Sequence, residues 1–479
     1  MSRIFLGLLI LISLSCLGQG SVVANVSTEN GGRKSRQIGY AEEKVTYEGA
    51  QVWRLAEVAD KSEYLDYLQD RGDLSLWRGN ESAMDVLVLP DVIPKVSRFL
   101  HQRNINFDVV IPDLQQAINH ENPMRTQEEI EELEGRNARY SWWKKWAVNG
   151  VHKKYLPRYR PDLPQKPFDK SVDGKGHRMD WSSYHRVDDI NGYLDYLANT
   201  YPHICSVMTI GKSHEGRDLK VLRISKGEEN APAIWIDGGI HAREWISPAV
   251  VTYIIDYLVE HSDNLGVDYY ILPVINPDGY EYTFRSDRLW RKNRGNPEKG
   301  GSCVGVDLNR NFGYKWGGMG TSKQPCRETY HGTGPFSEPE TRAIKNFFEI
   351  SAANFQAYLT FHSYGQYILY PWGYDRRVPP DYKDLDNVGR AMAAAMKKAG
   401  GSNSAYTVGN SASTLYAAAG GADDWAKAHV KVKYAYTVEL RDRGQHGFVL
   451  PANFIKPTAE EALAAVQEVA KAVRQIKKQ

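Results

Sequence analysis

Two potential metal ligands, His241 and Glu244, lie three positions apart shortly after an apolar segment of the chain. Residues 233–236 have the pattern of a buried strand, and the flexible pair Gly238 and Gly239 ends it. An imidazole and a carboxylate at this spacing can bind one divalent cation, yet the pair alone is weak evidence, because many surface helices carry such a pair by chance. A metal site therefore requires a third ligand elsewhere in the chain.

His362 is the candidate for that third ligand, at the end of the apolar segment 357–361. A histidine at the end of a strand is more often a structural residue than a ligand when it stands alone. Beside His241 and Glu244 it completes a set of two histidines and one carboxylate, which leaves one position on a zinc ion open for water. We therefore expect one Zn²⁺ at this site.

A carboxylate that is not a ligand is also needed if an activated water is to attack a peptide bond. Glu439 ends the apolar segment 434–438, where a buried charge is costly unless it is paired or functional. Glu439 could be a structural ion-pair partner of Arg441. Beside zinc it would act as the general base.

The elements that must position these residues lie in 179–479, called the C-terminal domain below, where predicted strands and helices alternate. In open α/β sheets, ligands bind at the carboxyl ends of strands, which is where His241 and Glu244 would lie. Ser247 and Pro248 have the pattern of a helix N-cap and a first helical position. Strands are expected at 207–210, 219–224, 233–236, 269–275, 358–362 and 434–439, and helices at 187–200, 385–399 and from about 458.

The chain upstream of this domain divides into four segments. A positive charge, an apolar core at 4–14 and small residues after it are typical of a secretory signal peptide, which we assign to 1–20. A polar, disordered lead-in is predicted for 21–44, and a compact α+β module, the N-terminal module, for 45–122. The basic, proline-rich segment 123–178 is predicted to be an exposed connector where proteolysis occurs, although its aromatic and basic residues also admit a membrane or nucleic-acid contact.

Composition gives no support to nucleic-acid or membrane partners. The 479 residues carry a net charge of +2, and their 42% hydrophobic and 25% charged fractions are ordinary for a globular protein. Of the four cysteines, Cys16 leaves with the signal peptide. Cys303 and Cys326 bracket a glycine-rich loop and are a natural disulfide in an oxidising compartment, whereas Cys205 is expected to be a small buried hydrophobic residue.

Five short motifs, in their order along the chain, resemble those of the pancreatic-type zinc carboxypeptidases. They are His241-Ala-Arg-Glu244, Asp307-Leu-Asn-Arg-Asn311, His362-Ser-Tyr364, Thr414-Leu-Tyr416 and Glu439-Leu-Arg-Asp442. Cys303 and Cys326 match the disulfide of that family, and the N-terminal module resembles its inhibitory activation domain. The resemblance implies a mixed twisted sheet flanked by helices, preceded by a small α+β open sandwich. The connector is longer than is usual in the family, so the resemblance does not locate the activation cleavage.

The resemblance also implies a role for each matching residue. The three ligand candidates would hold zinc, Glu439 would take a proton from water, and Arg294 would stabilise the oxyanion. Tyr416 would close over the site as a mobile cap. A guanidinium can grip a carboxylate through two N–H groups, and the residues expected to bind the free carboxylate of the substrate are Arg291, Asn309 and Arg310. Outer substrate contacts are expected from Arg243, Ser363, Tyr364 and Phe448.

Asp423 matches the position that forms the floor of the specificity pocket in this family, and Gly373 and Ser411 match residues that line it. An acidic floor is typical of the B-type members and would pair with a substrate Lys or Arg, whereas A-type members have an apolar floor. Asp423 and its neighbour Asp424 could instead be solvated loop residues.

These features together predict a secreted, monomeric zinc exopeptidase that removes C-terminal Lys or Arg. It would be made as a zymogen, inhibited by its own N-terminal module until a trypsin-like protease cuts the connector. Two alternatives are an A-type preference for apolar C-terminal residues and a peptide-binding relative without catalysis. A serine hydrolase has less support, because the chain has no Gly-x-Ser-x-Gly motif.

Overall fold

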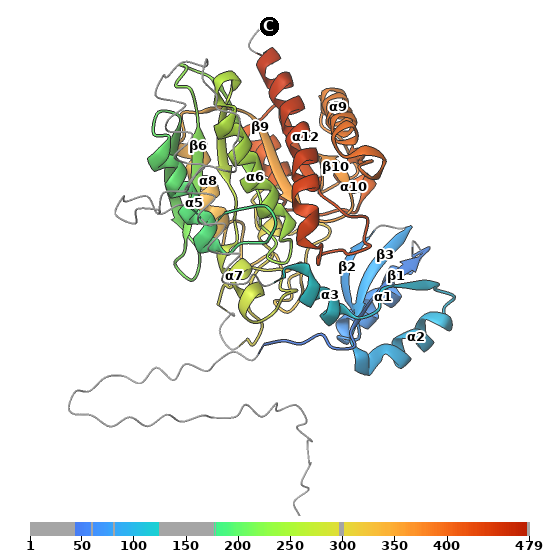
Figure 1. Ribbon diagram of the computed structural model, residues 1–479. Helices are drawn as coiled ribbons and strands as arrows, with labels where there is room; N and C mark the ends of the chain where they lie inside the picture. Colours follow the sequence, from blue (N-terminus) through green and yellow to red (C-terminus); the bar gives the residue numbers. More distant parts are fainter. Residues whose placement is uncertain are drawn as a thin grey trace, which may run out of the picture.

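The computed structural model describes residues 44–58, 61–79, 82–123, 177, 179–296 and 301–476 (Figure 1). The N-terminal module packs against one end of the C-terminal domain, and each part has a sheet of its own. The predicted signal peptide, the lead-in up to residue 43 and most of the connector lie outside the described residues. Among the residues that are described, no helix is long and apolar enough to span a bilayer.

The N-terminal module is a four-stranded antiparallel sheet in the order β2-β3-β1-β4, with helices packed on it. Its core includes Trp53, Leu65, Leu68 and Leu100, and the Trp53 ring stacks on Phe107 with 4.2 Å between ring centres. The strands are β1 (Gln51–Ala56), β2 (Ser75–Gly79), β3 (Ala83–Val88) and β4 (Phe107–Ile111). The helices are α1 (Ser62–Asp70), α2 (Ile93–His101) and α3 (Leu114–Glu121). Strand β2 was not predicted from the sequence.

The C-terminal domain has an eight-stranded mixed sheet in the order β11-β10-β12-β9-β7-β8-β6-β5. The central strands β12, β9, β7 and β8 are parallel, whereas β10, β6 and β5 each run antiparallel to the strand on their inner side. The strands are β5 (Cys205–Lys212), β6 (Asp218–Ile224), β7 (Pro232–Asp237), β8 (Asp268–Leu272), β9 (Asn354–His362), β10 (Tyr367–Tyr370), β11 (Thr407–Asn410) and β12 (Tyr434–Glu439). The predicted mixed sheet flanked by helices is confirmed.

Strand β7 shows how the sheet is buried on both faces. Its six residues are all buried, as expected for a central parallel strand. Ile234 and Ile236 pack with α5, α6, α9 and α12, while Ala233 and Trp235 pack with α8 and α11 on the other face. The helices are α5 (Val187–Thr200), α6 (Ile246–Glu260), α7 (Pro277–Arg285), α8 (Pro339–Ile350), α9 (Tyr382–Gly400), α10 (Ser411–Thr414), α11 (Ala422–Trp425) and α12 (Ile455–Ile476).

The turn after β7 differs from its prediction. Helix α6 begins at Ile246, one residue before Ser247, so Ser247 is not its N-cap. The Ser247 hydroxyl instead accepts a hydrogen bond from the Gly239 N–H at 3.0 Å and donates to the carbonyl of Phe361 at 2.6 Å. This hydroxyl therefore joins the turn at the end of β7 to the end of β9, next to both candidate histidines.

The cysteines lie as the sequence predicts. Cys303 and Cys326 form a disulfide with their Cα atoms 5.0 Å apart. Cys205 is a free, buried thiol at the start of β5, packed in the apolar core.

Candidate active site

The candidate ligands meet because three parallel strands end side by side. Strand β7 lies between β8 and β9, and β9 pairs with β12, where His362 and Glu439 are opposite each other as the last residues of their strands. After β7 the chain turns through Gly238 and Gly239. A side chain at Gly239 would approach Pro248 within 2.9 Å, and its φ of +63° favours glycine. The tight turn places His241 beside the end of β9.

His241, Glu244 and His362 are buried and converge on one point. Nδ1 of His241 lies 2.8 Å from Oε1 of Glu244, and Nδ1 of His362 lies 3.1 Å from Oε2 of the same carboxylate. The two Nδ1 atoms are 3.2 Å apart. Burial raises the pKa of Glu244, but the two imidazoles outweigh it and hold the pKa below its usual range.

The contacts of the two Nε2 atoms, which point away from Glu244, determine whether the two Nδ1 atoms can donate an electron pair to a metal ion. Nε2 of His241 lies 3.1 Å from Oδ1 of Asp307, and Nε2 of His362 lies 3.3 Å from the hydroxyl of Thr360. If each Nε2 carries the ring proton toward these oxygens, both Nδ1 atoms present lone pairs to each other and to Glu244. Three electron-pair donors facing one another repel unless a cation lies between them, and two histidines with one carboxylate suit Zn²⁺. The residues therefore fit a zinc ion.

Glu439 lies at the same edge without belonging to the ligand set. Burial raises its pKa, against the opposing effects of Arg78 from the N-terminal module and of His362. The position beside the ligands, in register with His362, is the one that a proton acceptor for an activated water needs.

The two arginines of the segment 290–294 lie in different surroundings. Arg291 is buried and donates from Nη2 to Oδ2 of Asp307 at 2.8 Å, so Asp307 links it to His241. The guanidinium of Arg294 instead stacks on aromatic rings, 3.7 Å from the ring centre of Tyr282. The oxyanion role predicted for Arg294 is therefore not supported by its position, and the geometry favours Arg291 for that role.

Asp423 and Asp424 are buried at the start of α11 rather than solvated. The Asp424 carboxylate accepts backbone N–H groups of Gly373 at 2.8 Å and of Tyr374 at 3.0 Å, which gives it a structural role. Burial raises the pKa of Asp423, and the Thr437 hydroxyl opposes that shift. Gly373, which was predicted to line the specificity pocket, leaves room there, because an added Cβ would lie 3.2 Å from the carbonyl oxygen of Ala418.

The other predicted substrate residues surround this region. Asn309 accepts the backbone N–H of Ala422, at 3.0 Å, which places it next to Asp423. Arg310 is buried beside it, and Arg310 and Arg291 both hold the pKa of Asp307 well below its usual range although burial opposes them. Tyr416 is 42% exposed. Tyr364 and Phe448 are buried where the N-terminal module meets the C-terminal domain, and the buried Arg243 lies over the Phe448 ring. Ser363 is buried beside the candidate ligands, and its backbone N–H donates to Glu244.

Two family models match the chain: zinc carboxypeptidase over residues 190–465 and carboxypeptidase activation peptide over residues 55–121. The chain belongs to the zinc carboxypeptidase family. Carboxypeptidase B of Astacus astacus is 49% identical over 301 residues, which are 62% of this chain and 99% of that protein. Two crystal structures each match 90% of this chain. The structure of thrombin activatable fibrinolysis inhibitor is 31% identical, with a TM-score of 0.71, and is matched over 100% of its chain. The structure of carboxypeptidase A from Helicoverpa armigera is 29% identical, with a TM-score of 0.73, and is matched over 99% of its chain.

The resemblance inferred from the motifs is thereby confirmed, and with it a zinc-dependent peptide hydrolase that carries an activation peptide. The predicted boundaries at 122 and 178 stay predictions. The N-terminal module of this zinc carboxypeptidase corresponds to the activation peptide, so its contacts with the C-terminal domain concern the control of the enzyme.

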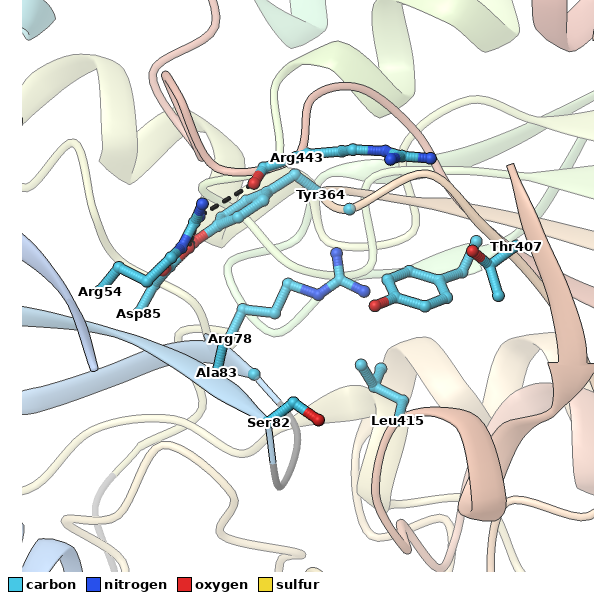
Figure 2. A pocket seen from close by; sticks show the side chains of 12 residues that line it. Arg54, Arg78, Ser82, Ala83, Asp85, Tyr364, Thr407, Leu415 and Arg443 are labelled. Carbon is cyan, nitrogen blue, oxygen red and sulfur yellow. Dashed lines mark hydrogen bonds and ion pairs between the residues drawn. The ribbon is translucent and has the colours of Figure 1, made fainter. Parts of the chain in front are cut away.

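These contacts involve Tyr364 and Phe448, two residues that were predicted to contact the substrate. Trp77 of β2 packs on Phe448 with ring centres 5.0 Å apart, and Asp85 of β3 accepts the hydroxyl of Tyr364 at 2.7 Å. Arg78 reaches from the module over the Tyr364 ring, beside a cavity of about 330 Å³ between the two parts (Figure 2). A side chain at Gly365 would overlap the Arg78 guanidinium, so the glycine makes room for it.

Sequence reasoning missed several of these residues. Asp307 opens one of the five motifs, and its position before Asn309 and Arg310 is the signal in the sequence that could have identified it. Trp77 and Asp85 had no signal in the sequence, because their contacts are made with residues more than 250 positions away.

Arg291 and Arg294 form a matched pair for testing the reassignment. We expect Arg291→Gln to lower kcat/KM for peptide hydrolysis by about 10²–10³-fold, because the developing oxyanion loses a buried donor. Arg294→Gln should stay within about threefold of the parent, since its guanidinium serves ring stacking. Both are measured as C-terminal residue release by the activated enzyme, with zinc content checked in each. A larger loss in Arg294→Gln would restore the original assignment.

Proposed function

We propose that this zinc carboxypeptidase is a secreted exopeptidase that releases C-terminal Lys and Arg. The observation that carries the specificity is the buried Asp423, next to an Asp424 whose carboxylate is engaged by backbone N–H groups. A buried carboxylate favours a cationic partner and disfavours an apolar one. The similarity to a carboxypeptidase B agrees with this choice.

His241, Glu244 and His362 are the residues that would hold zinc, which when bound polarises the scissile carbonyl and lowers the pKa of a water molecule. Glu439 takes the proton from that water and passes it to the leaving amine. Arg291, fixed by its ion pair with Asp307, donates to the oxygen on which negative charge develops.

The free carboxylate of the substrate restricts cleavage to the last residue. Asn309 and Arg310 would make this contact, and the hydrogen bonds of Asn309 with Asp307 and with Ala422 at the start of α11 support this role. Tyr416, whose side chain is exposed, would close over the bound residue. Residues preceding the scissile bond would contact Arg243, Ser363, Tyr364 and Phe448.

The N-terminal module would inhibit the enzyme by occupying those outer contacts. Trp77 belongs to the same apolar cluster as Tyr364 and Phe448, rather than to the module's own core. A buried ion pair between Arg288 and Glu121 holds α3 of the module to the C-terminal domain nearby. Cleavage of the connector by a trypsin-like protease would release the module. The Cys303–Cys326 disulfide and the predicted signal peptide support secretion, and we expect a monomer.

Replacement of Glu439 tests the hydrolytic mechanism. We expect Glu439→Gln to lower kcat by about 10²–10⁴-fold, because glutamine cannot accept the proton, while zinc content stays at one per chain. A chelator should abolish the parent activity. Turnover at the parent rate in Glu439→Gln would refute the assigned base, and no release from any peptide by the zinc-loaded, activated parent would favour a peptide-binding protein without catalysis.

Replacement of Asp423 tests the specificity. In Asp423→Ile, kcat/KM for peptides ending in Lys or Arg should fall by about 10²–10³-fold, because the substrate charge is buried unpaired. Release of Phe and Leu should rise. The control is Asp424→Asn, which keeps an acceptor oxygen for the backbone of Gly373 and should retain the preference for Lys and Arg. An unchanged preference in Asp423→Ile would instead indicate the A-type alternative or another selector.

Replacement of Trp77 tests the inhibition. We expect Trp77→Ala to raise the activity of the uncleaved protein at least about tenfold, because the loss of a large buried ring weakens docking of the module. After cleavage and removal of the module, the parent and variant enzymes have the same sequence and must have the same kcat/KM. Tyr67→Ala, on the exposed face of α1, serves as the control. Equal activity of uncleaved parent and Trp77→Ala would show that inhibition does not depend on this contact.

A further inference from the structure

The outer nitrogens of the two candidate histidines contact different kinds of group. Nε2 of His241 faces a carboxylate, Asp307, directly at 3.1 Å. Nε2 of His362 faces the neutral hydroxyl of Thr360 at 3.3 Å. A hydroxyl accepts well from an imidazole N–H only if its own hydrogen is directed to another acceptor. The orientation of His362 therefore depends on where the Thr360 hydrogen goes.

Asp237 is the acceptor that the fold places beside Thr360. The two residues are opposite each other in the pairing of β7 with β9. Asp237 has no exposed surface, and burial raises its pKa although the nearby hydroxyls of Thr360 and Tyr358 and the indole of Trp235 oppose that shift. Its Oδ1 is buried and meets no hydrogen-bond partner among the described residues, so this oxygen is available as an acceptor.

A buried carboxylate at the end of a central strand needs an explanation beyond packing. Its Oδ2 accepts the indole N–H of Trp235 at 2.7 Å, but a neutral amide or hydroxyl would serve that bond at a lower desolvation cost. A negative charge is useful here if a cation lies near, and Thr360, opposite Asp237 in the sheet, contacts the candidate ligand His362. Metal-bound histidines in general have their second nitrogen bonded to a carboxylate, a carbonyl or water.

We propose that Asp237 and Thr360 are positioning residues for His362. The Asp237 carboxylate accepts the hydrogen of the Thr360 hydroxyl, the hydroxyl oxygen accepts the Nε2–H of His362, and the lone pair on Nδ1 is held toward zinc. For His241, the Asp307 carboxylate accepts the Nε2–H directly, with no hydroxyl between them. This inference rests on the proposed ligand set, and it assigns a function to a buried charge that the reaction itself does not use.

The experiment measures zinc affinity and not only activity. Zinc dissociation constants of the full chain are determined by competition with a chromogenic chelator, and the stability of the zinc-free proteins by urea unfolding. We expect Thr360→Val and Asp237→Asn each to raise the zinc Kd by about 10–100-fold. Thr360→Ser, which keeps the hydroxyl, should stay within about threefold of the parent. Thr252→Val is the control for a buried threonine distant from the site.

The double variant Thr360→Val/Asp237→Asn adds a test of the connection. Because the two residues act in one chain of hydrogen bonds, its Kd should be close to that of the weaker-binding single variant, not to the product of both effects. Multiplication of the two effects would overturn the linked arrangement. If Thr360→Val does not fold, Thr360→Ser and Asp237→Asn still decide the proposal, since Ser keeps the hydroxyl and Asn keeps the shape of the Asp side chain.

Failure of the inference is distinguishable from failure of the ligand set. His362→Ala should lose zinc binding in any case, and parental affinity in that variant would refute the proposed ligands. If His362→Ala loses zinc but Thr360→Val and Asp237→Asn bind it as the parent does, only the positioning role is wrong. Reduced stability of the zinc-free variants with an unchanged Kd would assign Asp237 and Thr360 to folding alone.

Discussion

The fold of the C-terminal domain is organised around three electron-pair donors that face one another. Nδ1 of His241, Nδ1 of His362 and the carboxylate of Glu244 lie within hydrogen-bonding distance, while the outer nitrogens of both rings meet oxygens of other residues. A cation between the donors removes their repulsion. Zinc binding is therefore expected to stabilise the folded domain, because the donors lie at the adjacent ends of β7 and β9.

The charges around this point alternate in sign. Asp307 is shared by His241 and Arg291, and Arg310 lies within 3.9 Å of it. An isolated charge of this kind would be costly in the protein interior, and the sharing keeps each group ionised without access to water. The same network contacts His241, Arg291 and Arg310, so a change in Asp307 would affect the roles proposed for all three at once.

The sequence was sufficient to predict that His241, Glu244, His362 and Glu439 lie together, because polar residues at the ends of apolar segments are unusual. It was insufficient for Arg291 and Arg294, which lie three positions apart in one loop, because only the structure shows which side chain turns toward Asp307 and which stacks on Tyr282. Ser247 was expected to cap a helix, but the nearby glycine turn offered its hydroxyl better partners. The contacts of Trp77 could not be predicted, since they depend on how two separate sheets dock.

The position of Trp77 on Phe448 has a consequence for the time course of activation. Within one chain, the N-terminal module is present at an effective concentration of about millimolar relative to the surface it covers. Cutting the connector changes none of the contacts between Trp77, Tyr364 and Phe448. It lowers only the concentration of the module near the surface that it covers. Under the proposed inhibition, the severed module would then be an ordinary reversible competitor of peptide substrates. Activation would therefore be completed by dilution or by degradation of the module, and a concentrated store of cut enzyme would remain partly inhibited until it is dispersed.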